Sequence, residues 1–134
     1  MEIRRNIREK LIAWKRASGR KPLILQGPRH VGKTWLLKHF GAAEFDQVAY
    51  FNFEEQPGLK QFFSASMEIG PLISNLSFVY GKAITPETTL IIFDEVQECN
   101  KALISLKYFC ENAPEYAIAC ATSLLRVTMS KGNS

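Results

Sequence analysis

Residues 26–34 are Gln26-Gly27-Pro28-Arg29-His30-Val31-Gly32-Lys33-Thr34, and this segment decides which fold we expect. From Gly27 to Thr34 it fits Gly-x-x-x-x-Gly-Lys-Ser/Thr, the pattern of a phosphate-binding loop. The apolar residues 22–25 before it predict a buried parallel strand, and residues 35–40 after it predict a helix. Strand, glycine loop and helix, in that order, are the context that this motif requires.

The residue types in this segment suit the binding of a polyphosphate. Gly27 and Gly32 let the backbone curl close to the anion, so that its N–H groups and the start of the helix can face the phosphates. Lys33 would reach the β- and γ-phosphates, and the hydroxyl of Thr34 would hold Mg²⁺. A chance glycine turn with a solvated Lys33 is the alternative, and the next motif argues against it. The residues expected to contact the nucleotide here are Gly27, Pro28, Arg29, His30, Val31, Gly32, Lys33, Thr34 and Trp35.

A second motif follows at residues 89–95, where the chain is Thr89-Leu90-Ile91-Ile92-Phe93-Asp94-Glu95. Its apolar run predicts a central strand that is buried on both faces. Asp94 ends this strand, at the edge where ligands bind in open α/β sheets, and can bind Mg²⁺ through water opposite Thr34. Glu95 is then placed to orient or deprotonate an attacking water. Without the glycine loop, a solvated acidic turn would be the better interpretation.

Hydrophobic patterns predict the remaining helices and strands. Helices are expected at residues 2–17, 59–63, 71–80 and 100–112, and strands at residues 47–54 and 116–121. Because strands alternate with helices, we predict an α/β fold: a three-layer α/β/α P-loop NTPase core with a mainly parallel sheet.

The expected organisation is one core preceded by a helix. An amphipathic helix within residues 1–20 should pack on a nucleotide-binding core at residues 21–128, and residues 129–134 should form a frayed tail. Gly41 is expected to stop the helix after the glycine loop, and Asn100 is expected to cap the helix that follows Glu95. The acids at residues 54 and 55 are expected in a solvated loop, with an approach to the nucleotide site as the alternative.

Composition sets the class of protein. The chain has 134 residues and a net charge of +4, which fits one globular domain and permits a nucleic-acid contact without showing one. Three cysteines without paired spacing argue against a disulfide scaffold or a zinc site. The sequence lacks a signal-peptide pattern and an apolar stretch of membrane-spanning length, so we expect a cytoplasmic protein without membrane contact. The excess of positive charge lies in one stretch, at Arg4, Arg5, Arg8, Lys10, Lys15, Arg16, Arg20 and Lys21.

Three runs together carry a family resemblance: Gly27–Thr34, Phe93-Asp94-Glu95-Val96-Gln97 and Ala121-Thr122-Ser123-Leu124-Leu125. They resemble AAA+-type ATPases of bacteria and archaea, in the group with an Asp-Glu-Ile/Val-Gln strand and a following Gly-Ser-Leu-Leu stretch. The resemblance implies ATP binding with Mg²⁺, and hydrolysis in a competent member. It assigns Lys33 and Thr34 to the Walker A motif, Asp94 to the Mg²⁺-linked acid, Glu95 to the catalytic base, and Thr122 or Ser123 to the sensor.

P-loop proteins with such an acid–glutamate pair insert another strand between the two motif strands. We therefore expect the strand at 116–121 to lie there, with the hydroxyls of Thr122 and Ser123 directed at the γ-phosphate and the water. Thr122 stands where the family usually has Gly. Members of the family are usually longer, with a fifth strand and a helical lid, so we interpret the chain as an ATPase core that is incomplete at its C-terminus and truncated after the fourth strand.

Other functions remain open at this stage. A non-catalytic nucleotide-binding or interaction module is the main alternative, and a P-loop small-molecule kinase is a weaker one because the chain lacks an arginine-rich lid. A GTPase is disfavoured because residues 100–103 do not complete the guanine-reading Asn-Lys-x-Asp. Apart from the nucleotide, the partners expected are a second copy of the chain or another protein, since AAA+ relatives often complete the site with a neighbour's arginine.

Overall fold

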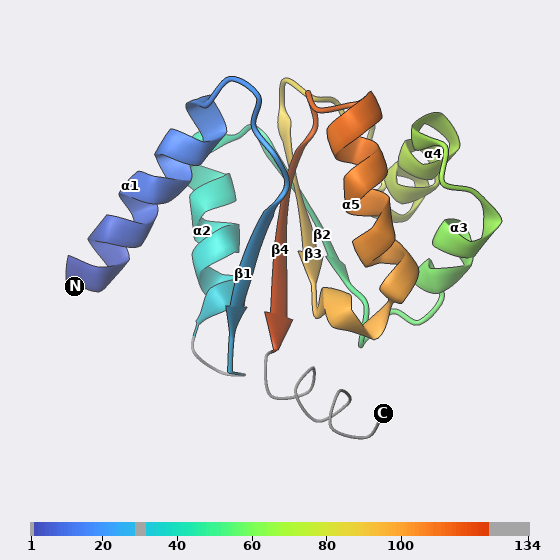
Figure 1. Ribbon diagram of the computed structural model, residues 1–134, viewed down its shortest axis with the longest axis horizontal. Coiled ribbons are helices and arrows are strands. Elements are labelled where there is room, and N and C mark those ends of the chain that lie inside the picture. The colour runs from blue at the N-terminus through green and yellow to red at the C-terminus, as the bar shows by residue number, and fades with distance from the viewer. Residues whose placement is uncertain (1, 29–31, 124–134) are drawn as a thin grey trace.

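A parallel sheet forms the middle of the molecule. The computed structural model describes residues 2–28 and 32–123, and the thin grey trace in Figure 1 marks the others. Its strands are β1 (Leu23–Gly27), β2 (Gln47–Asn52), β3 (Thr89–Asp94) and β4 (Ala117–Ser123). They pair in the order β1-β4-β3-β2, and each pair is parallel. The expectation that β4 lies between the two motif strands is therefore confirmed.

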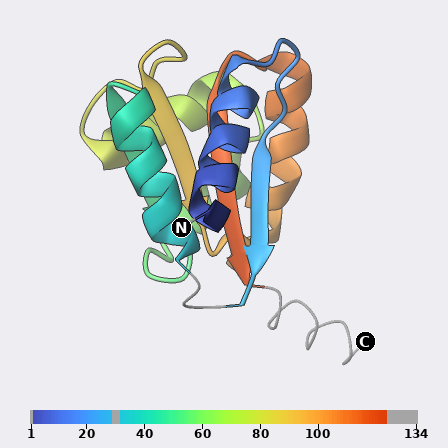
Figure 2. The same cartoon turned by 90° about the vertical axis from the view of Figure 1, so that its left-hand side faces the viewer.

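Helices cover both faces of this sheet, as Figure 1 shows. One face carries α1 (Glu2–Arg16) and α2 (Lys33–Glu44), which lie side by side in front of the sheet in Figure 2. The other face carries α3 (Leu59–Ala65), α4 (Ile69–Tyr80) and α5 (Asn100–Asn112). The predicted three-layer α/β/α architecture is confirmed. No helix in the described part of the chain combines the length and the apolar character that crossing a bilayer would require.

The apolar run of β3 is explained by its position between the two helical layers. Leu90 and Ile92 pack in the core under α1 and α2, while Ile91 and Phe93 pack in the core under α3, α4 and α5. Because successive side chains of a strand point to opposite faces, a strand covered on both faces has no position left for a polar side chain. Asp94, the first polar residue after this run, consequently falls at the carboxyl edge of the sheet.

Basic side chains near the N-terminus attach α1 to the core. The Nζ atom of Lys15 donates to the carbonyl oxygen of Glu44, at the end of α2, over 2.6 Å. Arg20 donates to the carbonyl oxygens of Lys15 and Glu115 over 3.0 and 2.8 Å, and partial burial lowers the pKa of its guanidinium. Leu11, on the core-facing side of α1, is buried. These two cations thus contact carbonyl oxygens of the protein itself.

Gly41 does not end α2, which corrects the sequence-based expectation. The helix continues to Glu44, and Gly41 lies buried inside it, against β2. A Cβ at Gly41 would lie only 2.6 Å from Cγ2 of Val48. Close approach between a helix and a strand, and not helix termination, is therefore the reason for a glycine here.

Two further helix starts differ from the predicted ones. Helix α4 begins at Ile69, two residues before the expected start at Pro71, because a proline in the first turn removes only an N–H that lacks an intrahelical partner. Asn100 is the first residue of α5, and Cys99 stands at the N-cap position without a side-chain capping hydrogen bond. The expected end of α5 at Asn112 is confirmed.

Candidate functional site

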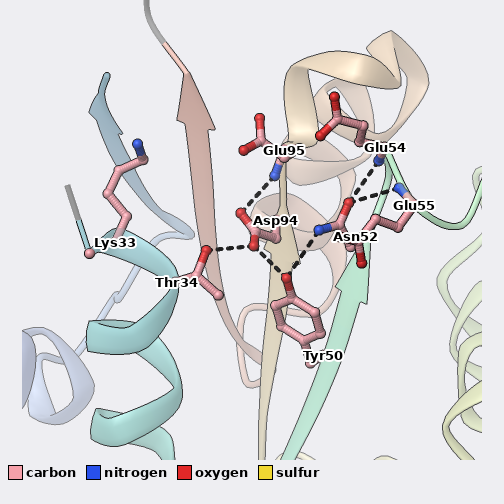
Figure 3. A pocket seen from close by; sticks show the side chains of 9 residues that line it. Lys33, Thr34, Tyr50, Asn52, Glu54, Glu55, Asp94 and Glu95 are labelled. Atoms are coloured by element: carbon pink, nitrogen blue, oxygen red, sulfur yellow. Dashed lines mark hydrogen bonds between the residues drawn. The ribbon is translucent and has the colours of Figure 1, made fainter. Parts of the chain in front are cut away.

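The two motifs meet in one pocket at the carboxyl edge of the sheet, shown in Figure 3. Helix α2 starts beside the end of β1, and Asp94 ends β3 close to it. The cavity has a volume of about 360 Å³. Its lining residues are Gly32, Lys33, Thr34, Tyr50, Asn52, Glu54, Glu55, Asp94 and Glu95.

Lys33 contacts the residues at the end of β1. Gly32 has a φ of 87°, a left-handed conformation that glycine adopts without a steric penalty. The Nζ atom of Lys33 donates to the carbonyl oxygens of Gly27 and Pro28, over 2.9 and 2.8 Å. Two neutral carbonyls therefore hold this ammonium, and a phosphate could replace them. The expected contacts at Arg29, His30 and Val31 lie outside the described residues.

Asp94 accepts hydrogen bonds from three elements of the fold. Its Oδ2 atom accepts from Oγ1 of Thr34, on α2, over 2.6 Å and from the phenol of Tyr50, on β2, over 2.5 Å. Its Oδ1 atom accepts from the backbone N–H of Glu95 over 2.9 Å. The residue is 3% exposed. A buried carboxylate with three donors has a fixed orientation towards the pocket.

The residues around Asp94 fit a magnesium ion that arrives with a phosphate. Thr34 gives its proton to Asp94, so the lone pairs of its hydroxyl oxygen are available to a metal. An ionised carboxylate has about four acceptor positions, and the three donors to Asp94 leave about one for a metal-bound water. Mg²⁺ usually keeps several waters and binds through one or two carboxylates together with substrate phosphates. The donor set at this end of the pocket matches that preference.

Glu95 has a strained backbone and a side chain with several partners. Its φ of 51° makes it the one non-glycine residue with positive φ among the residues that the structure describes. Such conformations are uncommon outside glycine and collect at functional sites. Its carboxylate accepts from Nε2 of Gln97 over 2.7 Å and from Oγ of Ser123 over 3.0 Å. The turn after β3 thus places this carboxylate beside Asp94 and ties it to the end of β4.

Gln97 joins the acidic turn to β4, and sequence reasoning missed it as a site residue. Its Oε1 atom accepts from Oγ1 of Thr122 over 2.9 Å, while its Nε2 atom donates to Glu95. Ser123 touches Glu95 directly, whereas the hydroxyl of Thr122 is directed at Gln97. The available signal was the fixed spacing of a glutamine two residues after Glu95 in a motif that was used only for its acids.

The end of β2 adds polar residues that the sequence analysis did not select. Tyr50 and Asn52 were considered only as part of an aromatic strand, yet Asn52 pairs with Asp94 in the register of β2 and β3. Burial, and next the hydrogen bond to Asp94, raises the pKa of the Tyr50 phenol. Glu54 and Glu55 lie in an exposed turn after β2, as expected, and they also line the pocket.

Trp35 lies away from this lining, although it directly follows the motif. Its indole is 51% exposed and stacks on the imidazole of His39, with ring centroids 4.7 Å apart. The pocket lining likewise contains neither Thr122 nor Ser123, which reach it only through Gln97 and Glu95. Among the expected residues, the structure therefore brings Gly32, Lys33, Thr34, Asp94 and Glu95 into one pocket.

A match to a known sequence family agrees with this arrangement. Residues 19–134 match the sequence model of a family described as AAA domain. Among solved structures, PCH-2 of C. elegans is similar with a TM-score of 0.49 and 14% sequence identity. That alignment covers 90% of this chain and 36% of the PCH-2 chain, so the present chain spans about a third of it. A search among curated proteins gave no significant match.

Proposed function

This chain belongs to the AAA domain family, and we propose that it binds ATP together with Mg²⁺ and hydrolyses the γ-phosphate. At the level of the family, the chain is an ATP-binding NTPase. The observation that carries the finer proposal is the 2.6 Å hydrogen bond between Thr34 and Asp94, which are 60 residues apart. This bond joins the loop that suits a phosphate to the acid that suits its metal ion.

The charge of the pocket supports a metal-dependent mode of binding. Among its described lining residues are four carboxylates, those of Glu54, Glu55, Asp94 and Glu95, and one ammonium, that of Lys33. A polyphosphate entering this space alone would meet like charges at short range, where attraction and repulsion are strong. A divalent cation would compensate both sets of charges and neutralise the charge that develops on the β- and γ-phosphates. We therefore expect the nucleotide to bind as its magnesium complex.

In this proposal the residues that bind phosphate are those of the glycine loop. Lys33 would exchange the carbonyl oxygens of Gly27 and Pro28 for phosphate oxygens, which are stronger partners because they are charged. The backbone N–H groups in the first turn of α2 would add donors at the positive end of the helix. The stretch from Gly27 to Trp35, with Arg29, His30 and Val31 in it, is thus proposed as the nucleotide-binding segment.

Glu95 is proposed as the base for the attacking water. The water oxygen attacks the γ-phosphorus, its proton passes to the Glu95 carboxylate, and the bond to the β–γ bridging oxygen breaks to release ADP. Ser123 and Gln97 would hold the carboxylate during this step, because both already donate to its Oε1 atom. Holding a base at the right place is worth a large part of the acceleration in such reactions. Thr122 would act one step removed, through Gln97.

The resemblance to AAA+ ATPases also supports two wider proposals. A second copy of the chain, or another protein, would complete the site with an arginine, and the protein would work in the cytoplasm. The contacts of the N-terminal cations with main-chain carbonyls give no support to nucleic-acid binding at Lys15 and Arg20.

The proposal is tested by calorimetry and phosphate release on the same sample. The wild-type chain is titrated with ATP in the presence of Mg²⁺, and inorganic phosphate is then measured over time. Binding followed by phosphate release is expected. Binding without any release would contradict the hydrolytic step and leave a nucleotide-binding module, and an absence of binding would contradict the whole proposal.

A further inference from the structure

We propose that Tyr50 is a positioning residue that orients Asp94 for the magnesium ion. The inference rests on the proposed function, since it concerns the metal that would accompany ATP. It adds a residue on β2 to a site that was otherwise derived from β1, α2, β3 and β4.

The hydrogen bonds between Asn52, Tyr50 and Asp94 have a defined direction. A carboxylate only accepts, so the 2.5 Å contact between Tyr50 and Oδ2 of Asp94 requires the phenol to donate its one proton there. The phenol oxygen in turn accepts from Nδ2 of Asn52 over 3.1 Å. The chain of donors therefore runs in one direction, from Asn52 through Tyr50 to Asp94. Figure 3 marks both hydrogen bonds with dashed lines.

Three of the acceptor positions of the Asp94 carboxylate are occupied. Thr34 and Tyr50 both donate to Oδ2, from α2 and from β2. The backbone N–H of Glu95 occupies one position on Oδ1. Counting about two lone-pair positions for each oxygen leaves the free position on Oδ1. Tyr50 thus occupies the second acceptor position on Oδ2. Without Tyr50, that position would compete with the free position on Oδ1 for the metal-bound water.

Tyr50 is itself held by contacts other than the one with Asp94. The ammonium of Lys38, one helical turn after Thr34, lies 3.8 Å from the centre of the Tyr50 ring. Asn52 is fixed in place as well, because its Oδ1 atom accepts from the backbone N–H groups of Glu54 and Glu55 over 2.9 Å each. The phenol is therefore preorganised from two sides, and its hydroxyl acts as a fixed donor.

The hydroxyl, and not the ring, is what this account requires. A phenylalanine would keep the ring beneath Lys38 and would remove only the donor to Asp94. Partners of metal-binding groups in the surrounding shell are typically worth about 10-fold to 100-fold in metal affinity. We expect Tyr50→Phe to fall at the lower end of this range, because Thr34 and the Glu95 N–H continue to hold Asp94.

The experiment compares ATP binding with and without the metal. Calorimetric dissociation constants for ATP are measured in Mg²⁺ and in EDTA, and their ratio reports how much the metal contributes. Four chains are compared: wild type, Tyr50→Phe, Asp94→Asn as the variant that should lose the effect, and Tyr108→Phe as a matched change on the exposed side of α5. Thermal unfolding of each chain shows whether it is folded.

The expected result is a loss of the metal effect alone. Tyr50→Phe should lower the ratio by about 10-fold with an unchanged constant in EDTA, while Tyr108→Phe matches wild type. An unchanged ratio in Tyr50→Phe, or equal weakening in Mg²⁺ and in EDTA, would overturn this inference but leave ATP binding intact. A wild-type ratio of one would also overturn it. A wild-type chain that does not bind ATP in either condition would overturn the proposed function, and this inference with it.

Discussion

The two sides of the pocket are built from contacts of very different range. On the loop side, Lys33 contacts carbonyl oxygens that lie six and five residues before it in the chain. On the acid side, Asp94 contacts residues 60 and 44 positions away, and Ser123 contacts Glu95 across 28 positions. The contacts on the loop side therefore come from one local motif. The contacts on the acid side form only when β4, β3 and β2 are paired in register.

This difference predicts different failures. Changes on the loop side should alter how tightly the nucleotide binds, because the loop supplies direct contacts to phosphate. Changes on the acid side should alter the rate or the metal dependence, because its residues act on the water and the metal. The following variants test that division, from the largest expected effect to the smallest.

Glu95→Gln should give the largest effect, and on the rate alone. The amide cannot accept the proton of the water, so phosphate release should fall by about 100-fold or more, the range for loss of a general base. ATP affinity in Mg²⁺ should stay close to that of wild type. The measurement is phosphate release at saturating ATP, with Glu111→Gln on the exposed face of α5 as the matched control. Turnover equal to wild type would show that Glu95 is not the base.

Lys33→Ala should act on affinity. Removing a charge-assisted contact to phosphate costs about 1.5–3 kcal/mol, which corresponds to a weakening of about 10-fold to 100-fold. The exposed Lys107, on α5, provides the matched control as Lys107→Ala. Calorimetric titration with ATP and Mg²⁺ gives both constants. If Lys33→Ala bound ATP as tightly as wild type does, the assignment of the glycine loop would be wrong.

Gln97→Ala should lower the rate moderately and leave the affinity unchanged. The variant removes one of the donors to Oε1 of Glu95 and the acceptor for Thr122. Since Ser123 still holds the base, we expect about a 10-fold loss in turnover, the energy of roughly one hydrogen bond. Gln61→Ala, at an exposed position of α3, controls for the loss of an amide. A parallel loss of ATP affinity would mean that Gln97 shapes the whole pocket and not the base.

Gly41→Ala should change stability and neither side of the pocket. Alanine gains about 1 kcal/mol over glycine in a helix interior, but overpacking a core costs about 1–3 kcal/mol. The contact of 2.6 Å with a stiff, β-branched Val48 makes the second effect larger, so the free energy of unfolding should fall by about 1 kcal/mol. Denaturant unfolding measures it. A gain in stability would show that Gly41 is not required for the packing of α2 on β2.

The sequence predicted most of the fold because its strong signals are local. Apolar runs predicted β3 and β4, and the glycine motif predicted the start of α2. The error at Gly41 has a physical cause: a glycine in a helix pattern can mean an end or a close contact, and only the position of Val48 distinguishes the two. The same holds for Asn100, because the backbone is extended at Cys99 and Asn100 is already helical, so that Cys99 and not Asn100 is the N-cap residue.

At the site, sequence reasoning identified the residues that belong to a recognisable motif. It missed those that reach the site only because the strands of the sheet pair with one another. Lys33, Thr34, Asp94 and Glu95 were expected and do line one pocket, while their roles stay predictions. Tyr50 could be found only from the register that sets Asn52 beside Asp94. Gln97 required the end of β4 to lie next to the turn after β3.

The most direct test of the account is phosphate release from ATP by the wild-type chain, following a calorimetric titration of the same sample with ATP and Mg²⁺. The account predicts saturable binding of one nucleotide per chain, stronger with Mg²⁺ than with EDTA, and release of phosphate that Glu95→Gln slows by about 100-fold or more. A chain that is folded but neither binds ATP nor releases phosphate would contradict it.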